Sequence, residues 1–396
     1  MIKSKTIILL ILISLVAFSC EKDKPPFVEK NDKTLLVYIM GENTLSQFIE
    51  DDIEEMERGF KVSDYNNLIL FIDDYSKPRI VRIEKNNSGE SIRNEIFLYE
   101  KELLSTDPDV MKDVFSYVFK QYPAESYGLI LWSHGDGWLP DYDGRSRWIG
   151  QDGGSYGPKM NIPELASVLR QFPKFEFIFF DACFMQSIEV AYELRNYAEY
   201  IIGSPTETPG PGAPYQLMIP IMLKKQANME KMINDYYRYY SSSASQHEWT
   251  YGAAISVIKC SELEKLCAET KNIVSEYKNY LGNADLSKVQ MYDFRNGINS
   301  SKNSCLYYDI NSFFNSFANE RDYNIWKQQL DKCMPYKATT NSCYSGPGRC
   351  SFPIDTEQYS GLSTYILQTG INYLKWNNYY KELNWYKDAG WSMTIW

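Results

Sequence analysis

The sequence of 396 residues contains only two histidines, His134 and His247. It also lacks the short motifs HExxH, GxxxxGK[ST], GxSxG and CxxC, which disfavours zinc peptidases, phosphate-loop proteins, serine hydrolases of the α/β type and dithiol oxidoreductases. No basic block occurs, and 41 Lys and Arg stand against 51 Asp and Glu, so we expect no nucleic-acid partner. Histidine, the usual general base in catalysis, is therefore scarce in this chain, and the positions of His134 and His247 are informative.

The composition predicts a globular protein with a substantial core. Hydrophobic residues make up 44% of the chain, enough for one large or two modest domains. The 32 Tyr, 19 Phe and 9 Trp are unusually many, and such side chains often line clefts as well as filling cores. An acidic surface would suit a cationic ligand.

The N-terminus has the pattern of an export signal. Lys3 and Lys5 precede an apolar run over residues 7–18, and small Ser19 stands before Cys20. The run is too short for a comfortable membrane span. "LVAFSC" resembles a bacterial lipobox, so we expect a signal peptide at 1–19, a lipid on Cys20 and a flexible tether at 20–32. The expected location is the bacterial outer membrane, facing the cell surface or the periplasm; otherwise the protein is secreted.

Six further cysteines follow Cys183, and outside the cytoplasm an even set invites disulfide bonds with fifteen possible pairings. Cys260 and Cys267 lie on one predicted helix and should not bond each other. Cys343 and Cys350 bracket the turn-rich "YSGPGR" and are the better pair.

Apolar strands alternate with amphipathic helices through the first half of the chain. This pattern predicts an α/β fold with a mostly parallel sheet and helices on both faces. Strands are expected in 33–43, 67–74, 127–134, 175–180 and 198–204, and helices in 46–60, 107–122, 161–172 and 187–196. We expect an α/β core at 33–215 and a mostly helical C-terminal part at 216–396, with strands at 252–259 and 361–367.

Two chemically distinctive segments follow predicted strands. His134 ends one strand, and Asp181-Ala182-Cys183 ends another. Functional residues of parallel sheets gather beyond the carboxyl ends of the strands. If these strands are neighbours, the imidazole and the thiol face one another across a shared cleft.

Each residue also has a plainer interpretation. Cys183 could be a small buried hydrophobe, although its place before a predicted helix would favour a thiolate. His134 could be a hydrogen-bonded structural residue. Gly135 could form a simple turn, or its amide could help that of Cys183 to bind a tetrahedral oxyanion.

Acidic residues between these segments raise a metal alternative. Asp136, Asp141, Asp143 and Asp152 could suit calcium, but their spacing matches no complete calcium loop. Solvated loop acids are the simpler interpretation, so the metal assignment stays open.

Several segments together resemble the clostripain family of cysteine peptidases, within the caspase-like clan. They are "LVYIMGENTLSQFIEDDIEEM", "LILWSHGDGW", "FDACFMQSIEVAYELRN", "SPTETPGPG", "GLSTYIL" and "YYKELNWYKDAGW". The resemblance runs from about Lys33 to the end. It implies a caspase-like fold and a dyad of His134 and Cys183 that hydrolyses protein or peptide substrates.

The resemblance also implies that Asp181 lies in an S1 pocket for Arg or Lys, which suits the pairing of a carboxylate with a guanidinium. It further implies self-cleavage between His134 and Cys183, with Arg145, Arg147 and Lys159 as candidate points, and calcium as a possible ion that the chemistry itself does not require. We expect a monomer.

The chain departs from the family where many relatives carry Gly-Trp-Asp-Tyr. It has Gly212-Ala213-Pro214-Tyr215 there, so an acidic floor residue is missing and Glu207 is the candidate replacement. Two other functions stay open: a catalytically silent surface-binding lipoprotein, and a thiol hydrolase of another amide or ester.

Overall fold

The computed structural model describes residues 31–61, 66–140, 147–154, 157–242, 252–294, 305–370 and 373–394. The expected signal peptide, Cys20 and most of the tether lie outside the described residues. Within the described ranges, no helix is both long and apolar enough to cross a bilayer.

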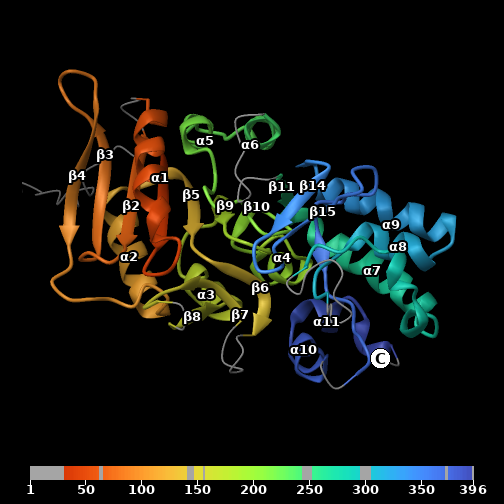
Figure 1. Cartoon of the computed structure of the whole chain (residues 1–396). Coiled ribbons are helices and arrows are strands. Elements are labelled where there is room, and N and C mark those ends of the chain that lie inside the picture. The colour runs from red at the N-terminus through yellow and green to blue at the C-terminus, as the bar shows by residue number, and fades with distance from the viewer. Residues whose placement is uncertain are drawn as a thin grey trace, which may run out of the picture.

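A nine-stranded sheet forms the centre of the molecule (Figure 1), in the order β13-β11-β10-β9-β5-β1-β2-β3-β4. The central strands β10, β9, β5, β1 and β2 are parallel, and the strands at both edges are antiparallel. Their bounds are β1 Asn31–Met40, β2 Asn66–Asp73, β3 Arg79–Lys85, β4 Ser91–Leu98, β5 Ala124–Trp132, β9 Phe175–Asp181, β10 Ala198–Gly203, β11 Ala254–Lys259 and β13 Tyr336–Thr339. The mostly parallel sheet is confirmed.

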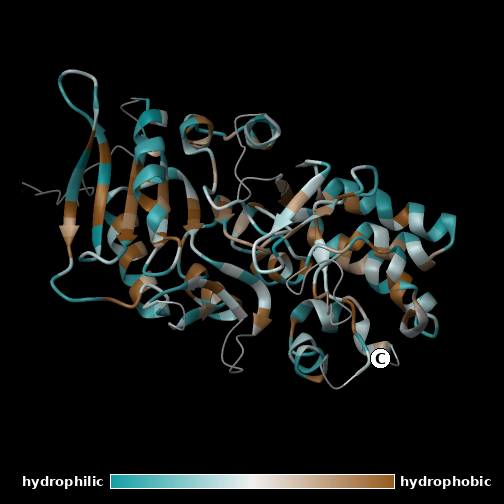
Figure 2. Cartoon of the chain, viewed as in Figure 1, coloured by the Kyte–Doolittle hydropathy of each residue, from teal (hydrophilic) through white to brown (hydrophobic). Residues whose placement is uncertain are grey.

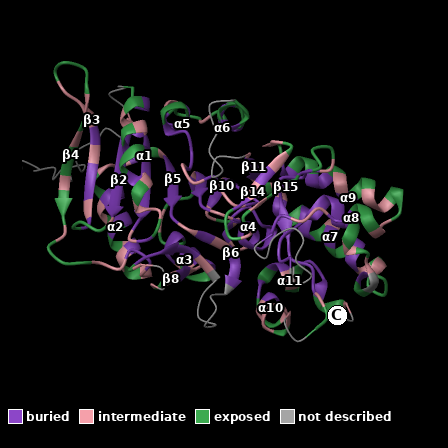
Figure 3. Ribbon diagram, viewed as in Figure 1, coloured by how far each residue is buried: buried purple, intermediate pink, exposed green. Residues whose placement is uncertain are grey.

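Helices cover both faces of this sheet, also as expected. One face packs against α1 (Ser46–Gly59), α5 (Tyr215–Met222) and α6 (Met229–Ser241), and the other against α2 (Pro108–Gln121), α3 (Ile162–Leu169) and α4 (Ile188–Leu194). Along β1, Leu36 and Tyr38 join one core and Leu35 and Val37 the other, because side chains alternate along a strand. The central strands are brown in Figure 2 and purple in Figure 3, as expected of strands buried on both faces.

The C-terminal part is mostly helical, and it also completes the sheet. Its helices are α7 Leu263–Tyr277, α8 Ile310–Phe317, α9 Glu320–Cys333, α10 Leu374–Tyr380 and α11 Asn384–Asp388. Its strands β11 and β13 extend the sheet beyond β10, so the core and the extension share one layer. Trp385 of α11 packs edge-on against Tyr192 of α4, with ring centroids 5.4 Å apart.

The strand expected at 361–367 shrinks to β16 (Ser363–Thr364), which pairs with β12 (Tyr308–Asp309). The next amide, that of Tyr365, donates to the buried carboxylate of Glu189 at 2.8 Å instead of to a strand. This side-chain partner replaces a sheet hydrogen bond and ends the strand.

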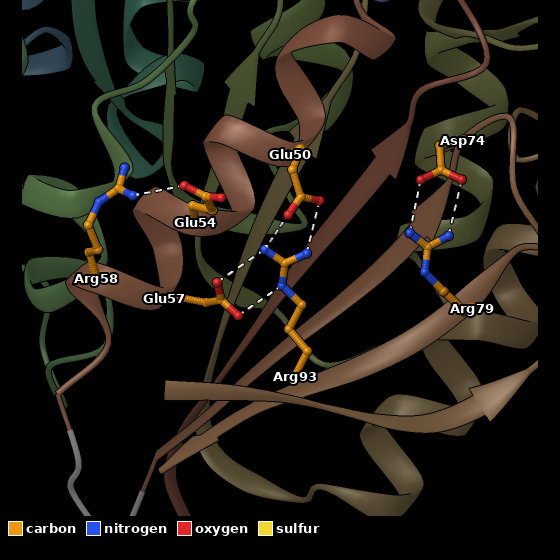
Figure 4. Close-up of polar contacts among 7 residues, drawn as sticks. All are labelled: Glu50, Glu54, Glu57, Arg58, Asp74, Arg79 and Arg93. Carbon is orange, nitrogen blue, oxygen red and sulfur yellow. Dashed lines mark hydrogen bonds and ion pairs between the residues drawn. The ribbon is translucent and has the colours of Figure 1, made fainter. Parts of the chain in front are cut away.

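Ion pairs fasten the exposed edge of the sheet (Figure 4). Arg93 of β4 reaches Glu50 and Glu57 of α1, with N to O distances of 2.8 Å to each, and Arg79 of β3 pairs with Asp74 at 2.9 Å. Half-exposed pairs of this kind contribute little free energy of unfolding. The two pairs of Arg93 fix where the β3–β4 hairpin lies against α1, and the pair of Arg79 closes the turn between β2 and β3.

Candidate active site

The pairing of β5 with β9 brings His134 and Cys183 to one place. The two strands are parallel neighbours, with Trp132 opposite Asp181, and each candidate residue lies two positions beyond this pair. Both residues line one cleft of about 720 Å³ at the carboxyl edge of the sheet. The prediction that their strands are neighbours is confirmed.

Hydrogen bonds to both the side chain and the backbone hold His134 in place. Its Nε2 lies 2.8 Å from Oγ1 of Thr44, in the loop after β1, and its carbonyl accepts from the amide of Gly150 at 3.0 Å. Burial, together with the positive charge of Lys159, lowers the pKa of the imidazole to about 4. The ring is therefore neutral at pH 7 and can accept a proton. Sequence reasoning missed Thr44.

Cys183 is not at a helix N-terminus. Helix α4 begins at Ile188 behind its cap Ser187, so the expected helix-dipole effect on the sulfur is wrong, because that field fades within the first turn. The amide of Thr208 instead donates to Sγ at 3.3 Å, and such a bond favours the charged form of an acceptor.

The residue after the candidate nucleophile has a strained backbone. Phe184 has a φ of 59°, a conformation that is rare for a bulky side chain. Its amide donates to the carbonyl of Thr206 at 3.0 Å, and its ring stacks on Tyr307 with centroids 4.7 Å apart. These contacts hold the sharp turn that starts at Cys183, and backbone strain of this kind gathers at functional sites.

Gly135 allows the His134 segment and the Cys183 segment to approach each other. It opens strand β6 (Gly135–Pro140), which belongs to a small sheet with β7 (Arg147–Gln151) and β8 (Lys159–Asn161), so it is not merely a turn residue. A Cβ at this position would lie 2.9 Å from both the Ala182 Cβ and the Cys183 carbonyl oxygen. Any side chain there would therefore push the His134 segment away from Cys183.

Asp181 lies at the buried floor of the cleft. Its Oδ2 accepts from the amide of Ala213 at 2.9 Å and from the hydroxyl of Tyr215 at 2.7 Å. Burial raises the pKa of Asp181 to about 6. Burial also raises the pKa of Asp52 to about 9, and the nearby charge of Asp181 adds to this shift. Near pH 7, Asp52 is thus protonated and Asp181 carries the negative charge.

A hairpin of the C-terminal part forms the far wall of the cleft. It consists of β14 (Ser342–Ser345) and β15 (Cys350–Pro353), and Tyr344, Gly346, Pro347 and Arg349 line the cavity. Glu207 accepts from the hydroxyl of Ser345 at 2.6 Å and from the amide of Gly346 at 3.0 Å, so its carboxylate is already engaged with this wall. Sequence reasoning singled out Glu207 but not its partners.

The expected bond between Cys343 and Cys350 is not formed. All seven described cysteines are free thiols. Across the hairpin, Cys343 faces Phe352 and Cys350 faces Ser345, so the two cysteines lie two residue pairs apart along the hairpin.

The candidate processing points fall in different surroundings. Arg145 lies outside the described residues, Arg147 opens β7 and Lys159 opens β8. The ammonium of Lys159 lies 4.2 Å from the centroid of the Trp148 ring. Both strands are paired in the small sheet, so cleavage at either position would require them to separate first.

The structure describes two of the four acidic residues considered for calcium, Asp136 and Asp152. Asp141 and Asp143 lie outside the described residues, while Asp152 is buried and accepts from the hydroxyl of Ser105 at 2.8 Å. Asp136 lines the cleft. Among the described residues, no three His, Cys, Asp or Glu side chains gather at a possible metal position. The calcium expectation stays a prediction.

A buried parallel sheet, a cysteine and a histidine at adjacent strand ends, and helices on both faces define a thiol hydrolase scaffold of the caspase-like type. The sequence pattern of the clostripain family matches residues 37–396. The chain therefore belongs to the clostripain family of cysteine peptidases.

Individual relatives agree with this assignment. Clostripain of Hathewaya histolytica is 30% identical over 217 residues, which cover 47% of this chain and 41% of that protein. A secreted C11 cysteine protease from Bacteroides thetaiotaomicron, solved with an irreversible peptide inhibitor, is 36% identical with a TM-score of 0.79, over 91% of this chain and 99% of that one. An inactive zymogen C11 protease from Parabacteroides distasonis is 31% identical with a TM-score of 0.77. The match covers 91% of this chain and 98% of that one.

We predict that His134 titrates near pH 4 in a histidine NMR experiment, well below its ordinary value of 6.5. The substitution Lys159→Gln should raise this midpoint, because it removes the charge that opposes imidazole protonation. The variant His247→Gln leaves a single imidazole in the chain and assigns the resonance. A midpoint near 6.5 in the unmodified protein would contradict the described environment.

Proposed function

We propose that the chain is an exported cysteine endopeptidase in which Cys183 is the nucleophile and His134 the base. The observation that supports this most is the pairing of β5 with β9, which directs both residues into one cleft. The relatives with solved structures are proteases, and one of them is described as secreted. The export signal, lipid attachment at Cys20 and a monomeric state remain parts of this proposal.

The reaction follows from the chemistry of the two side chains. His134 takes the thiol proton, and the sulfur attacks the carbonyl carbon of the scissile peptide. The resulting oxyanion is stabilised by the amides of Cys183 and Gly135. The tetrahedral species then collapses: its C–N bond breaks, and the amine leaves with the proton from His134. Water, deprotonated by the same histidine, finally hydrolyses the thioester and restores the free thiol.

Thr44 acts as a positioning residue for the base. With Nε2–H donating to the Thr44 hydroxyl, the neutral ring has its lone pair on Nδ1. That nitrogen is then the one that accepts the proton of Cys183. The hydrogen bond fixes both the tautomer and the ring plane, and this reduces the reorganisation needed during the reaction.

Asp181 selects a basic side chain at the P1 position. Its Oδ2 is occupied by Ala213 and Tyr215, whereas Oδ1 accepts no hydrogen bond within the described part of the chain. A guanidinium or ammonium entering the cleft can pair with this oxygen. Glu207 can contribute only if its bonds to the hairpin rearrange.

The loop between His134 and Cys183 is the proposed processing region. The zymogen state described for the Parabacteroides distasonis relative supports such a step. Arg145, Arg147 and Lys159 are the candidate points, each with the basic side chain that Asp181 would select.

A silent binding protein and a hydrolase of other amides or esters are the competing functions. The retained thiol and the neutral imidazole in one cleft favour catalysis over silent binding. The protease relatives favour a peptide bond over other acyl groups.

We predict that Cys183→Ala abolishes cleavage of an arginine-containing peptide library, lowering turnover by about a thousandfold or more, as expected for loss of a nucleophile. Iodoacetamide should label Cys183 faster than the other cysteines, with sites read by mass spectrometry. The matched control is Cys350→Ala, which removes another half-buried thiol and should keep turnover. Full activity in Cys183→Ala would exclude the proposed chemistry.

We predict that Asp181→Asn lowers kcat/KM for an Arg peptide about tenfold relative to its neutral citrulline analogue, because a charge-assisted hydrogen bond is lost. The same ratio in the unmodified enzyme should fall as the pH drops through about 6, where Asp181 becomes protonated. In Asp181→Asn the ratio should not change with pH. A ratio that is equal in both proteins removes Asp181 from specificity.

We predict that Thr44→Val lowers kcat about tenfold with little change in KM, since one positioning hydrogen bond is lost. Thr44→Ser keeps the hydroxyl and should retain most activity. Nitrogen NMR of the imidazole gives an independent measurement: Thr44→Val should lose the fixed Nε2–H tautomer. An unchanged tautomer together with unchanged kcat would show that Thr44 plays no part.

A further inference from the structure

Arg349 is a cation in the cleft for which the reaction described above has no use. It lies at the turn of the β14–β15 hairpin and is exposed, and it is the only lysine or arginine among the described residues that line the cavity. Within the described ranges its guanidinium forms no ion pair and no hydrogen bond. A guanidinium in this position can accept an anionic partner from outside the chain.

The backbone at Arg349 has the left-handed conformation, which residues other than glycine rarely adopt. Its φ is 46°, and the only other described non-glycine residue with positive φ is Phe184, which follows the nucleophile. Both strained residues line the same cleft. Strain that persists at a ligand-facing position is an indication of function, since the surroundings must enforce it.

The hairpin is built to hold this position. Its tip is fastened to the opposite wall through Glu207, as described above, and internally the amide of Gly348 donates to the Ser345 hydroxyl at 3.2 Å. The amide of Arg349 donates to the carbonyl of Gly346 at 3.1 Å. Behind the tip, Phe352 stacks on Phe294 with centroids 4.4 Å apart. The arginine is therefore carried on a pre-organised loop, which reduces the entropy lost when a ligand binds.

The lining of the cleft thus carries charges of both signs, because Asp181 and Glu207 are acidic and Arg349 is basic. Asp181 gives a negative floor, whereas Arg349 gives a positive tip on the hairpin. A substrate that carries only basic residues would complement the first and be repelled by the second.

We propose that Arg349 binds a carboxylate of the substrate, so that the enzyme selects peptides with an acidic group near the scissile bond as well as a basic P1 residue. This inference rests on the proposed peptidase function and names the substrate class of the same cleft. The carboxylate can come from an Asp or Glu side chain or from the C-terminus of the peptide, and the test separates these sources.

The test uses peptides with one fixed Arg and alanine elsewhere, in which Glu or its neutral isostere Gln is placed at each of the neighbouring positions in turn. A second series ends shortly after the Arg with either a free carboxylate or an amide. Binding to the Cys183→Ala protein is measured by fluorescence polarisation, and turnover is measured with the active enzyme. Binding does not require catalysis, so a failure of the peptidase proposal appears separately as absent turnover.

At one position, the Glu peptide should bind and react about five- to tenfold better than the Gln peptide, as expected for a charge-assisted hydrogen bond. Arg349→Gln should abolish this preference, Arg349→Lys should retain part of it, and Arg349→Glu should reverse it. The control Arg321→Gln, at the exposed start of α9, should leave the preference unchanged. If the effect occurs only in the second series, the carboxylate is the C-terminal one. Equal Glu and Gln values at all positions, or a preference that survives in Arg349→Gln, would overturn the proposal.

Discussion

The parallel pairing of β5 with β9 is the constraint on which the rest of the site depends. Both strands are buried on both faces, with Leu129 and Leu131 in one core and Ile130 and Trp132 in the other. A slip of one residue would exchange these faces, so the register is strongly specified. Because the two strands end at the same level, the segments after Trp132 and Asp181 must emerge side by side. The sheet thus supplies the proximity of His134 and Cys183, and the surrounding loops need only orient them.

Orientation comes from polar contacts that join loops to each other. Asp181 holds the loop at Ala213 and Tyr215, and Glu207 holds the hairpin, so two carboxylates act as connectors between segments distant in sequence. Buried carboxylates are tolerated only where donors compensate for lost hydration. Asp181 combines two roles: its donors stabilise the charge, and the residue also lines the cleft. Burial partly opposes that charge and leaves the carboxyl half-ionised in mildly acidic solution.

The sequence predicts those features that follow from short-range periodicity and from general rules of sheet topology. The predicted strands at 127–134 and 175–180 are mostly apolar, and the polar residues at and after their carboxyl ends are expected at one edge of a parallel sheet. Thr44 and the hairpin could not be found in this way, because their contacts with His134 and Glu207 span 90 and 138 residues without any periodic signal. The expected helix-dipole effect is wrong because four non-helical residues, 184–187, separate Cys183 from the start of α4. Export, the processing point and the oxyanion amides remain predictions.

The hairpin that forms the far wall of the cleft comes late in the sequence, and this has a consequence for biosynthesis. The cleft is enclosed by a hairpin at 342–353, and the strand before it, β13, closes the outer edge of the sheet by pairing with β11. A nascent chain therefore carries His134 and Cys183 well before the hairpin that completes their cavity has been added. Until the hairpin is added, the cleft lacks the wall that Tyr344, Gly346, Pro347 and Arg349 form.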